Sequence, residues 1–358
     1  MSIQELFAVP PYSLQQAEKQ TRLLPVLNEL TLHHYQTCPA YARLIDVVWA
    51  GPREARTLAE IPYLPVGLFK RHALASVPDH KIVQTLTSSG TTGQQPSRVF
   101  LDQETADLQS RALVRIMSEV LGPRRLPMLV VDVPGLLKDR ASFSARGAGV
   151  LGMMKFGLQP VFVLDNDMRL NREALERFLL RHGDQPFLIF GFTFMVWRYF
   201  YDPLRTLGVD LSKGILIHSG GWKKLEEAAV DGATFKQRFR GATGLSRVHN
   251  FYGMVEQVGS VFLEGDDGFF HPPVFADIIV RDPQTWEEAP AGRPGVLQLV
   301  SALPRSYPGH SLLTEDLGIL HRVDAPQGQW QGKAFSVVGR VPRAELRGCS
   351  DTFAASLG

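Results

Sequence analysis

Hydrophobic and polar positions along the first third of the chain follow a helical period in two places. Leucines recur at close to helical spacing over Ser13–Tyr41, with Ser13 as a plausible N-cap, so this range is expected to form a helix. A second helix is expected over Asp102–Leu121, where apolar residues gather on one side. Proline-rich stretches at 61–65 and 77–78 separate the two and predict loops.

The middle of the chain alternates between short apolar runs and helical patterns. Expected strands are Pro127–Val133, Gln159–Leu164, Phe187–Phe192, Gly214–His218 and Arg247–Tyr252; expected helices are Asn171–His182, capped by Asn171, and Lys223–Phe239. This alternation predicts an α/β fold with a largely parallel sheet. Ligands of such sheets bind on the loops at the carboxyl ends of the strands. The loops at 219–222 and 252–256 are therefore candidate binding loops.

The final third shows short β patterns with turn residues between them and little helical pattern. The expected strands are Ser260–Glu264, Phe275–Val280, Gly295–Ala302 and Ala334–Val338. We therefore expect three consecutive parts: an N-terminal helical segment over 1–80, an α/β body over 81–259 and a mainly β subdomain over 260–358.

Composition narrows the function classes. With 44% hydrophobic and 21% charged residues the chain is of ordinary globular type, and its net charge of +2 argues against a nucleic-acid binder. No apolar run approaches the roughly 18 residues of a membrane span. The start has no signal-peptide pattern, and two cysteines are too few for a disulfide scaffold, so a cytoplasmic location is expected.

The segment Thr85–Arg98, TLTSSGTTGQQPSR, is the first candidate for chemistry. Gly90 and Gly93 let the backbone approach a ligand closely, and successive N–H groups in such a loop can hold an anion. Hydroxyl donors are added by Ser88, Ser89, Thr91 and Thr92. This combination suits a polyphosphate, although an exposed Ser/Thr/Gly linker has the same composition. A P-loop is not indicated, because no Lys follows Gly93.

Two later stretches follow predicted strands. In HSGGWKK, the pair Gly220 and Gly221 offers bare backbone to a planar base, or forms a plain glycine turn. In NFYGMVEQVG, Tyr252 could lie beside a purine, and Glu256 could supply an oxygen ligand to Mg²⁺. Taken alone, Glu256 fits a surface carboxylate better than a metal ligand.

The last candidates lie near the end of the chain. In SLLTEDLG, Asp316 follows an apolar strand and suits the hydroxyls of a ribose, but Glu315 could do the same, and the spacing does not choose. Arg340 is expected at a strand end, where it either contacts sugar or phosphate or is solvated. Cys349 lies in the polar sequence RGCSD, downstream of several arginines that lower a thiol pKa, with acidic residues acting in the other direction. Cys38, at a helix end, is expected to be structural.

Taken in order, these stretches resemble the adenylate-forming ligase superfamily. The resemblance implies that residues 87–93 bind the ATP phosphates and that Asp316 binds ribose, with Gly339–Arg340 as the following GR pair. It implies that adenine and metal lie near Gly220, Gly221, Tyr252, Gly253, Met254 and Glu256. It also implies the fold of the large domain of these ligases, followed by a mainly β subdomain.

Four of the stretches look closely like the LuxE-type acyl-protein synthetases: HSGGWKK, HNFYGMVEQVGSVFLE, SYPGHSLLTEDLG and VGRVPRAELRGCSD. This resemblance covers roughly residues 85–351. It implies that the chain makes acyl-AMP from a fatty acid and ATP, moves the acyl group to Cys349 and passes it to a partner acyl reductase. The segment 191–201, GFTFMVWRYFY, also fits this family, and Phe192, Phe194 and Trp197 are candidates for the acyl pocket or for an ordinary buried segment.

The sequence departs from the larger adenylate-forming ligases in the basic residues that would face the phosphates. Those ligases carry a Lys soon after the glycine loop and another in a C-terminal lid domain, whereas Ser97 and Arg98 follow the loop here and no full lid is expected. Arg98 or Lys223 could serve instead. Two alternatives stay open: an acyl- or aryl-CoA ligase similar to phenylacetate–CoA ligase, and a non-catalytic nucleotide-binding subunit that scaffolds an acyl reductase.

Overall fold

The computed structural model describes residues 3–88, 96–137, 145–222, 229–259 and 261–341. The chain divides into two compact units that interleave along the sequence. Unit 1 comprises Met1–Ile116, Gly253–Phe262 and Phe269–Gly358, and unit 2 comprises Met117–Tyr252 and Leu263–Gly268. The three consecutive parts expected from the sequence follow a different division, and their boundaries stay a prediction.

Unit 2 is built around a parallel sheet. Its strands are β4 (Leu126–Val130), β5 (Gly157–Phe162), β6 (Phe187–Phe192), β7 (Gly214–Ser219) and β8 (Arg247–Tyr252), in the order β5-β4-β6-β7-β8. Strands β6 and β7 are buried along almost their whole length, which explains their near-continuous apolar sequences. The predicted α/β fold is confirmed.

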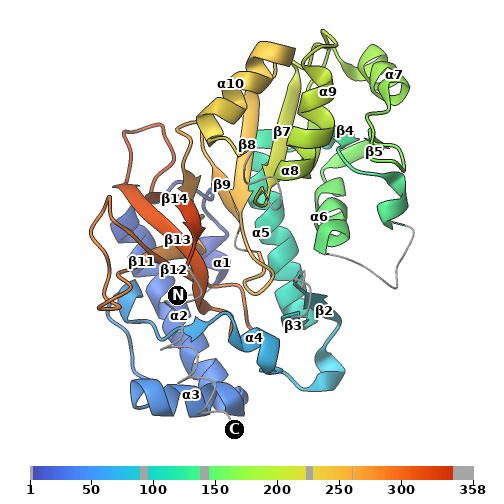
Figure 1. Ribbon diagram of the computed structural model, residues 1–358. Coiled ribbons are helices and arrows are strands. Elements are labelled where there is room, and N and C mark those ends of the chain that lie inside the picture. The colour runs from blue at the N-terminus through green and yellow to red at the C-terminus, as the bar shows by residue number, and fades with distance from the viewer. Residues whose placement is uncertain (1–2, 89–95, 138–144, 223–228, 260, 342–358) are drawn as a thin grey trace. The chain divides into compact units, whose positions relative to one another are not determined.

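Helices accompany this sheet, coloured green to yellow in Figure 1. They are η3 (Pro134–Leu137), α6 (Ala145–Met154), α7 (Arg172–His182), α8 (Thr193–Met195), the π-helical turn η4 (Val196–Tyr201), α9 (Asp202–Leu204) and α10 (Gly232–Thr243). Asn171 caps α7 as expected, since its side chain accepts a hydrogen bond from the N–H of Ala174 at 3.0 Å. Helix α10 begins at Gly232 within the range predicted as a helix over Lys223–Phe239, and Asp231 caps it by accepting from the N–H of Thr234 at 2.7 Å. Residues 223–228 of that prediction lie outside the described residues.

Unit 1 contains an antiparallel sheet. Its order is β11 (Ala276–Arg281), β12 (Pro294–Ser301), β13 (Ser311–Val323), β14 (Lys333–Arg340) and β10 (Phe270–His271), and β1 (Leu64–Pro65) pairs parallel with β13. Short strand β9 covers Phe262–Glu264. The mainly β final third is confirmed, but the sequence analysis did not list β13, which has 13 residues.

Helices α1 (Ile3–Leu6), α2 (Gln16–Thr37), α3 (Pro39–Trp49) and α4 (Leu68–Arg71) precede that sheet in the chain, with short 3₁₀ turns η1 (Leu58–Glu60) and η2 (Asp79–Lys81). The single helix predicted over 13–41 is wrong at both ends. Gln15, not Ser13, is the N-cap, and Cys38 leaves the helical conformation because Pro39 opens α3. Helix α5 (Gln103–Leu121) confirms the second expected helix.

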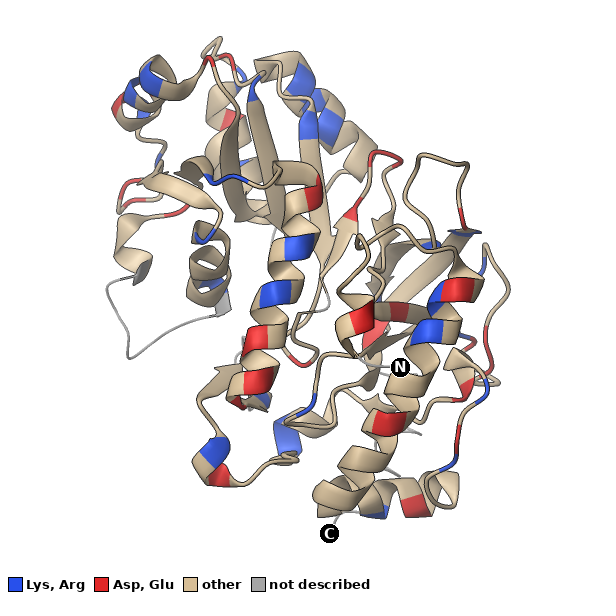
Figure 2. Ribbon diagram, turned by 180° about the vertical axis from the view of Figure 1, so that it is seen from behind, with Lys and Arg blue, Asp and Glu red and all other residues tan. Residues whose placement is uncertain are grey.

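Positions of Lys and Arg and of Asp and Glu are interspersed along the ribbon in Figure 2, in keeping with the net charge of +2. None of the helices in the described ranges is both long and apolar enough to cross a membrane.

Candidate active site

The glycine-rich loop is the turn of a hairpin. Strand β2 (Gln84–Thr87) pairs antiparallel with β3 (Arg98–Leu101), which places residues 88–97 between them. The base of this loop is closed by two hydrogen bonds: the N–H of Ser97 donates to Ser88 Oγ at 2.9 Å, and the N–H of Ser88 donates to Ser97 O at 3.2 Å. The other candidates in the loop, which are Ser89, Gly90, Thr91, Thr92 and Gly93, lie outside the described residues.

Ser97 is a residue that the sequence analysis did not single out as a ligand. Its side chain is fully buried, and its Oγ has no hydrogen-bond partner among the described residues. A buried hydroxyl without a partner is costly, so its presence at the base of a loop suited to anions favours a ligand there. In the sequence, Ser97 is marked only by its position after Pro96, where the loop leads into β3.

The turn after β7 exposes bare backbone. Gly220 has a φ of +82°, a conformation that favours glycine, and both Gly220 and Gly221 are exposed. A Cβ added at Gly220 would lie 3.5 Å from the ring of Phe192, and one added at Gly149 in α6 would lie 3.0 Å from the same ring. The absence of side chains at these two glycines therefore lets the Phe192 ring lie close to α6 and to the turn.

The end of β8 holds a second unpartnered polar atom. The N–H of Asn250 donates to Glu264 Oε2 at 2.8 Å, while Asn250 Oδ1 is buried without a partner in the part of the chain that the structure describes. Tyr252, which ends the strand, is half-buried. An amide oxygen beside an aromatic ring can accept a hydrogen bond from an amino group on a stacked base. The sequence analysis did not identify Asn250, because a single asparagine within a strand pattern does not indicate a binding site.

The loop that carries Glu256 is tied down by its neighbours in unit 1. Gln257 Nε2 donates to the carbonyls of Leu299 at 3.0 Å and Gly309 at 3.1 Å, and the N–H of Val258 donates to Tyr307 Oη at 3.0 Å. Burial, and also the charge of Glu256, raise the pKa of Tyr307, which stays a neutral phenol.

Glu256 itself is 8% exposed, so the alternative of a surface carboxylate is wrong. Its carboxylate makes no hydrogen bond or ion pair with the described residues, which leaves its oxygens for a ligand. Of the other candidates in this loop, Gly253 is exposed and Met254 is half-buried against the core of unit 1.

Asp316 and Arg340 face each other across β13 and β14, where they are register partners. Arg340 Nε lies 3.4 Å from Asp316 Oδ1, and Arg340 NH2 lies 3.8 Å from Glu315 Oε2. Asp316 lies within β13 rather than after a strand, because pairing with β14 continues past it. Arg340 ends β14, as expected.

The motif residues thus fall in both units. Comparisons with known proteins identify the family of the chain. The family model described as "Acyl-protein synthetase, LuxE" matches residues 3–358. The chain belongs to the LuxE acyl-protein synthetase family. It is therefore an ATP-dependent, AMP-forming ligase.

Its relatives include two proteins named "Long-chain-fatty-acid--luciferin-component ligase". The one from Aliivibrio fischeri is 23% identical over 82% of this chain and 78% of its own length. The one from Vibrio harveyi is 22% identical over 95% of this chain and 88% of its own length.

Solved structures of 2-hydroxyisobutyryl-CoA ligase share the fold. The complex with R3-HIB-AMP in the postadenylation state has a TM-score of 0.68 at 17% identity, covering 92% of this chain and 69% of the ligase. The open conformation with 2-HIB-AMP and CoA has a TM-score of 0.67 at 18% identity, covering 93% of this chain and 74% of the ligase. At these identities the likeness establishes the adenylate-forming fold alone.

In this LuxE-family chain the aromatic segment 191–201 packs largely inward. Trp197 is 5% exposed and stacks on Tyr201 and Phe235, with ring centroids 4.6 and 5.4 Å apart. Phe192 and Phe194 are half-buried at the edge of the same core. An acyl pocket formed by Phe192, Phe194 and Trp197 stays a prediction.

The two cysteines of this LuxE-family chain differ in their surroundings as far as the structure describes them. Cys38 is 2% exposed in the core of unit 1, and burial raises the pKa of its thiol. This confirms its expected structural role. Cys349 lies outside the described residues, as does Lys223.

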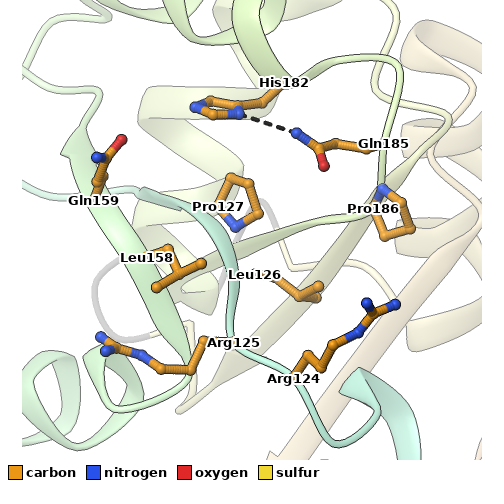
Figure 3. Close-up of a pocket in the computed structure, with 9 residues that line it drawn as sticks. All are labelled: Arg124, Arg125, Leu126, Pro127, Leu158, Gln159, His182, Gln185 and Pro186. Atoms are coloured by element: carbon orange, nitrogen blue, oxygen red, sulfur yellow. Dashed lines mark hydrogen bonds between the residues drawn. The ribbon is translucent and has the colours of Figure 1, made fainter.

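A cavity of about 460 Å³ lies elsewhere in unit 2, lined by residues such as Leu126, Leu158 and Pro186 (Figure 3). These residues lie at the amino ends of β4, β5 and β6, whereas Gly220 and Tyr252 lie at carboxyl ends. This cavity is therefore not the site that the motifs mark.

Proposed function

We propose that this chain activates a long-chain fatty acid with ATP and carries the acyl group as a thioester on Cys349. A carboxylate oxygen of the acid attacks the α-phosphorus of ATP, the bond to the pyrophosphate oxygen breaks, and acyl-AMP and pyrophosphate form. The Cys349 thiolate then attacks the acyl carbonyl carbon, the thioester forms, and AMP leaves. The acyl group passes from there to a partner acyl reductase, and we place these steps in the cytoplasm.

The observation that carries the thioester step is the contrast between the two cysteines. Cys38 is enclosed in the core with a raised pKa, which disfavours the thiolate that a nucleophile needs. The chain has two cysteines in total, so a thioester on this protein falls to Cys349. The sequence around it, RGCSD, is polar, and Cys349 follows Arg340, Arg343 and Arg347, whose positive charges favour a thiolate, whereas the acidic residues nearby act in the other direction.

The nucleotide part of the proposal assigns the motif residues to the phosphates, the adenine and the ribose of ATP. Ser88 and the hydroxyls and N–H groups up to Gly93 would hold the phosphates, with the buried Ser97 hydroxyl at the base of the loop. The Gly220–Gly221 backbone, Tyr252 and the neighbouring Gly253 and Met254 would contact adenine, with the amide oxygen of Asn250 as acceptor. Asp316 would accept the ribose hydroxyls, held in place by Arg340.

The buried carboxylate of Glu256 fits a Mg²⁺ ion, which prefers oxygen ligands. No group of three or more His, Cys, Asp or Glu side chains in the described ranges is arranged to hold a metal ion, so phosphate oxygens would complete the shell. When bound there, Mg²⁺ would neutralise part of the phosphate charge. Among the chain's own cations, Arg98 at the start of β3 is exposed and, with Lys223, is our candidate for stabilising the leaving pyrophosphate.

The fatty acid as substrate class rests on two supports. Relatives that match most of this chain are named as long-chain-fatty-acid ligases. The half-buried ring of Phe192 lies next to the Gly220 turn and, with the half-buried Phe194, would offer an apolar wall for an acyl chain. Trp197 is buried in the core against which both rings pack. The apolar wall itself does not select chain length.

Pyrophosphate exchange tests the activation step. Incubated with ATP, labelled pyrophosphate and a series of fatty and aromatic acids, the protein should exchange label with long-chain fatty acids in particular. Silence across the series would overturn the proposal in favour of a nucleotide-binding scaffold subunit. Rapid formation of acyl-CoA when CoA is added would favour a CoA ligase.

A further inference from the structure

His218 lies near the carboxyl end of β7, between β6 and β8 in the parallel sheet of unit 2. It is the residue before the last in β7, and its register partners are Gly191 in β6 and Asn250 in β8. Two positions further along the chain comes Gly220, where the exposed glycine turn begins. The side chain of His218 is only 5% exposed.

The imidazole is held from two sides. Its Nδ1 lies 2.9 Å from Thr193 Oγ1, at the start of α8 in the aromatic segment 191–201. Its ring stacks on Phe235 of α10, with centroids 4.6 Å apart and planes 24° from parallel. His218, two residues before the turn, is thus fixed to the start of α8 and to α10.

Burial is the main reason that this histidine stays neutral. Together with the positive charge of Lys236 on α10 and the neighbouring His249 on β8, burial lowers the pKa of His218 to about 3. Lys236 pairs with Glu264 at 3.0 Å, and Glu264 O lies 3.0 Å from His249 Nδ1. A neutral imidazole keeps one donor and one acceptor, so the bond with the Thr193 hydroxyl persists across the working pH range.

The glycine turn cannot fix its own geometry. A Cβ added at Gly221 would meet no described atom within 4 Å, and glycine has more backbone freedom than any other residue. A ligand that lies on such a backbone binds best when the turn is already held in place. The contacts of His218 hold the turn from its amino-terminal side, and the ring of Trp222, whose centroid lies 5.4 Å from that of Trp197, holds it from the other side.

We infer that His218 is a positioning residue. Its hydrogen bond to Thr193 holds the Gly220–Gly221 turn at a fixed position relative to the aromatic segment 191–201. On the proposed function, this bond keeps the turn that receives adenine aligned with the wall that receives the acyl chain. The inference rests on that function only for the identity of the ligands.

A double-mutant cycle tests the inference. Because the bond is neutral and buried, His218→Phe and Thr193→Val should each raise the KM for ATP in pyrophosphate exchange roughly 3- to 10-fold. The double variant should be no worse than the worse single one, since both remove the same bond. His218→Gln, which can still bond Thr193, should recover most of the loss, and His182→Gln at the end of α7 is the matched control.

Other results would overturn the inference that His218 positions the glycine turn. Additive effects in the double variant, or unchanged KM values with only lower thermal stability, would mean that the bond does not position the turn. A pH–rate profile that loses a limb between pH 6 and 9 in His218→Gln would assign acid–base chemistry to the ring instead. If His218→Phe does not fold, the KM for ATP of Thr193→Val tests the inference alone.

Failure of the proposed function is a separate result. Wild-type protein without exchange activity would count against the function, and calorimetric Kd values for ATP in the same variants would still test His218. Equal Kd values in wild type, His218→Phe and Thr193→Val would reject the positioning role.

Discussion

Arg340 reaches two adjacent carboxylates, and the surroundings of each decide which one suits a ribose. The Asp316 side chain is 18% exposed and lies 3.4 Å from the guanidinium, whereas that of Glu315 is 37% exposed and lies 3.8 Å away. The Asp316 N–H also donates to Thr314 Oγ1 at 3.1 Å, which fixes the backbone there. Asp316 is therefore the better held of the two acceptors.

Substitution separates these carboxylates. Because hydrogen bonds to a charged group contribute about 1.5–3 kcal/mol, Asp316→Asn should raise the KM for ATP roughly 10- to 100-fold in pyrophosphate exchange. Glu315→Gln, one residue away, is the matched control and should stay within about twofold. The reverse order of the two effects would move the ribose contact to Glu315.

For single residues, the sequence predicts which residues belong to the motifs but not which groups they contact. Asp316, Arg340 and Glu256 follow from the resemblance. Ser97 and Asn250 stand out only because folding buries one polar atom of each without a partner, which no local pattern reveals.

At the scale of elements, the loop before and after Glu256 is clamped by the segment that leads into β13. Tyr307 Oη accepts the N–H of Val258, and a Cβ added at Gly309 would lie 2.2 Å from the Tyr307 ring. A glycine is required at 309 because the ring and the backbone of Glu256 crowd that position. The position of the Glu256 loop thus depends on the fit of residues 307–309.

Tyr307→Phe should therefore destabilise the protein and loosen the loop. Loss of the hydroxyl leaves the Val258 N–H buried without an acceptor, which costs about 1–3 kcal/mol. Denaturant unfolding should show this loss, and pyrophosphate exchange should show a lower kcat. Tyr35→Phe, which removes an exposed bond to Asp46, is the control and should change stability little. Equal effects of both variants would contradict the clamp.

The elements that the sequence predicted best are strands bounded on both sides by turn or loop residues. The bounds of β6 and β8 match the expected runs, although β6 is almost fully buried and β8 is not. Strand β13 was missed because Thr314–Asp316 interrupts its apolar pattern, although pairing with β12 and β14 carries the strand through. The β2–β3 hairpin was missed because β2 is mostly exposed and polar.

At the scale of the whole molecule, histidines buried in their neutral form link stability to pH. In unit 1, burial lowers the pKa of His310 to about 3 and that of His34 well below its ordinary value. In unit 2, burial lowers the pKa values of His218 and His249. Below about pH 6.5 the unfolded chain binds protons at these sites that the folded chain does not.

Stability should therefore fall as the pH drops from 6.5 towards 3 and change little from these groups above 7. Each such histidine contributes up to about 1.4 kcal/mol per pH unit in that window. Urea unfolding at pH 7.5, 6.5 and 5.5 measures the slope. His310→Asn should reduce it, and the exposed His80→Asn should not. A flat or reversed slope in the wild type would contradict the neutral burial of these side chains.

The most direct test of the whole account follows the acyl group. Wild-type protein incubated with ATP, Mg²⁺ and radiolabelled long-chain fatty acid should retain label in a bond that neutral hydroxylamine cleaves. Cys349→Ser should lose that hydroxylamine-sensitive label while keeping acid-dependent pyrophosphate exchange, and Cys38→Ser, if folded, should keep both. Hydroxylamine-sensitive label that persists in Cys349→Ser would contradict the assignment of the acyl carrier.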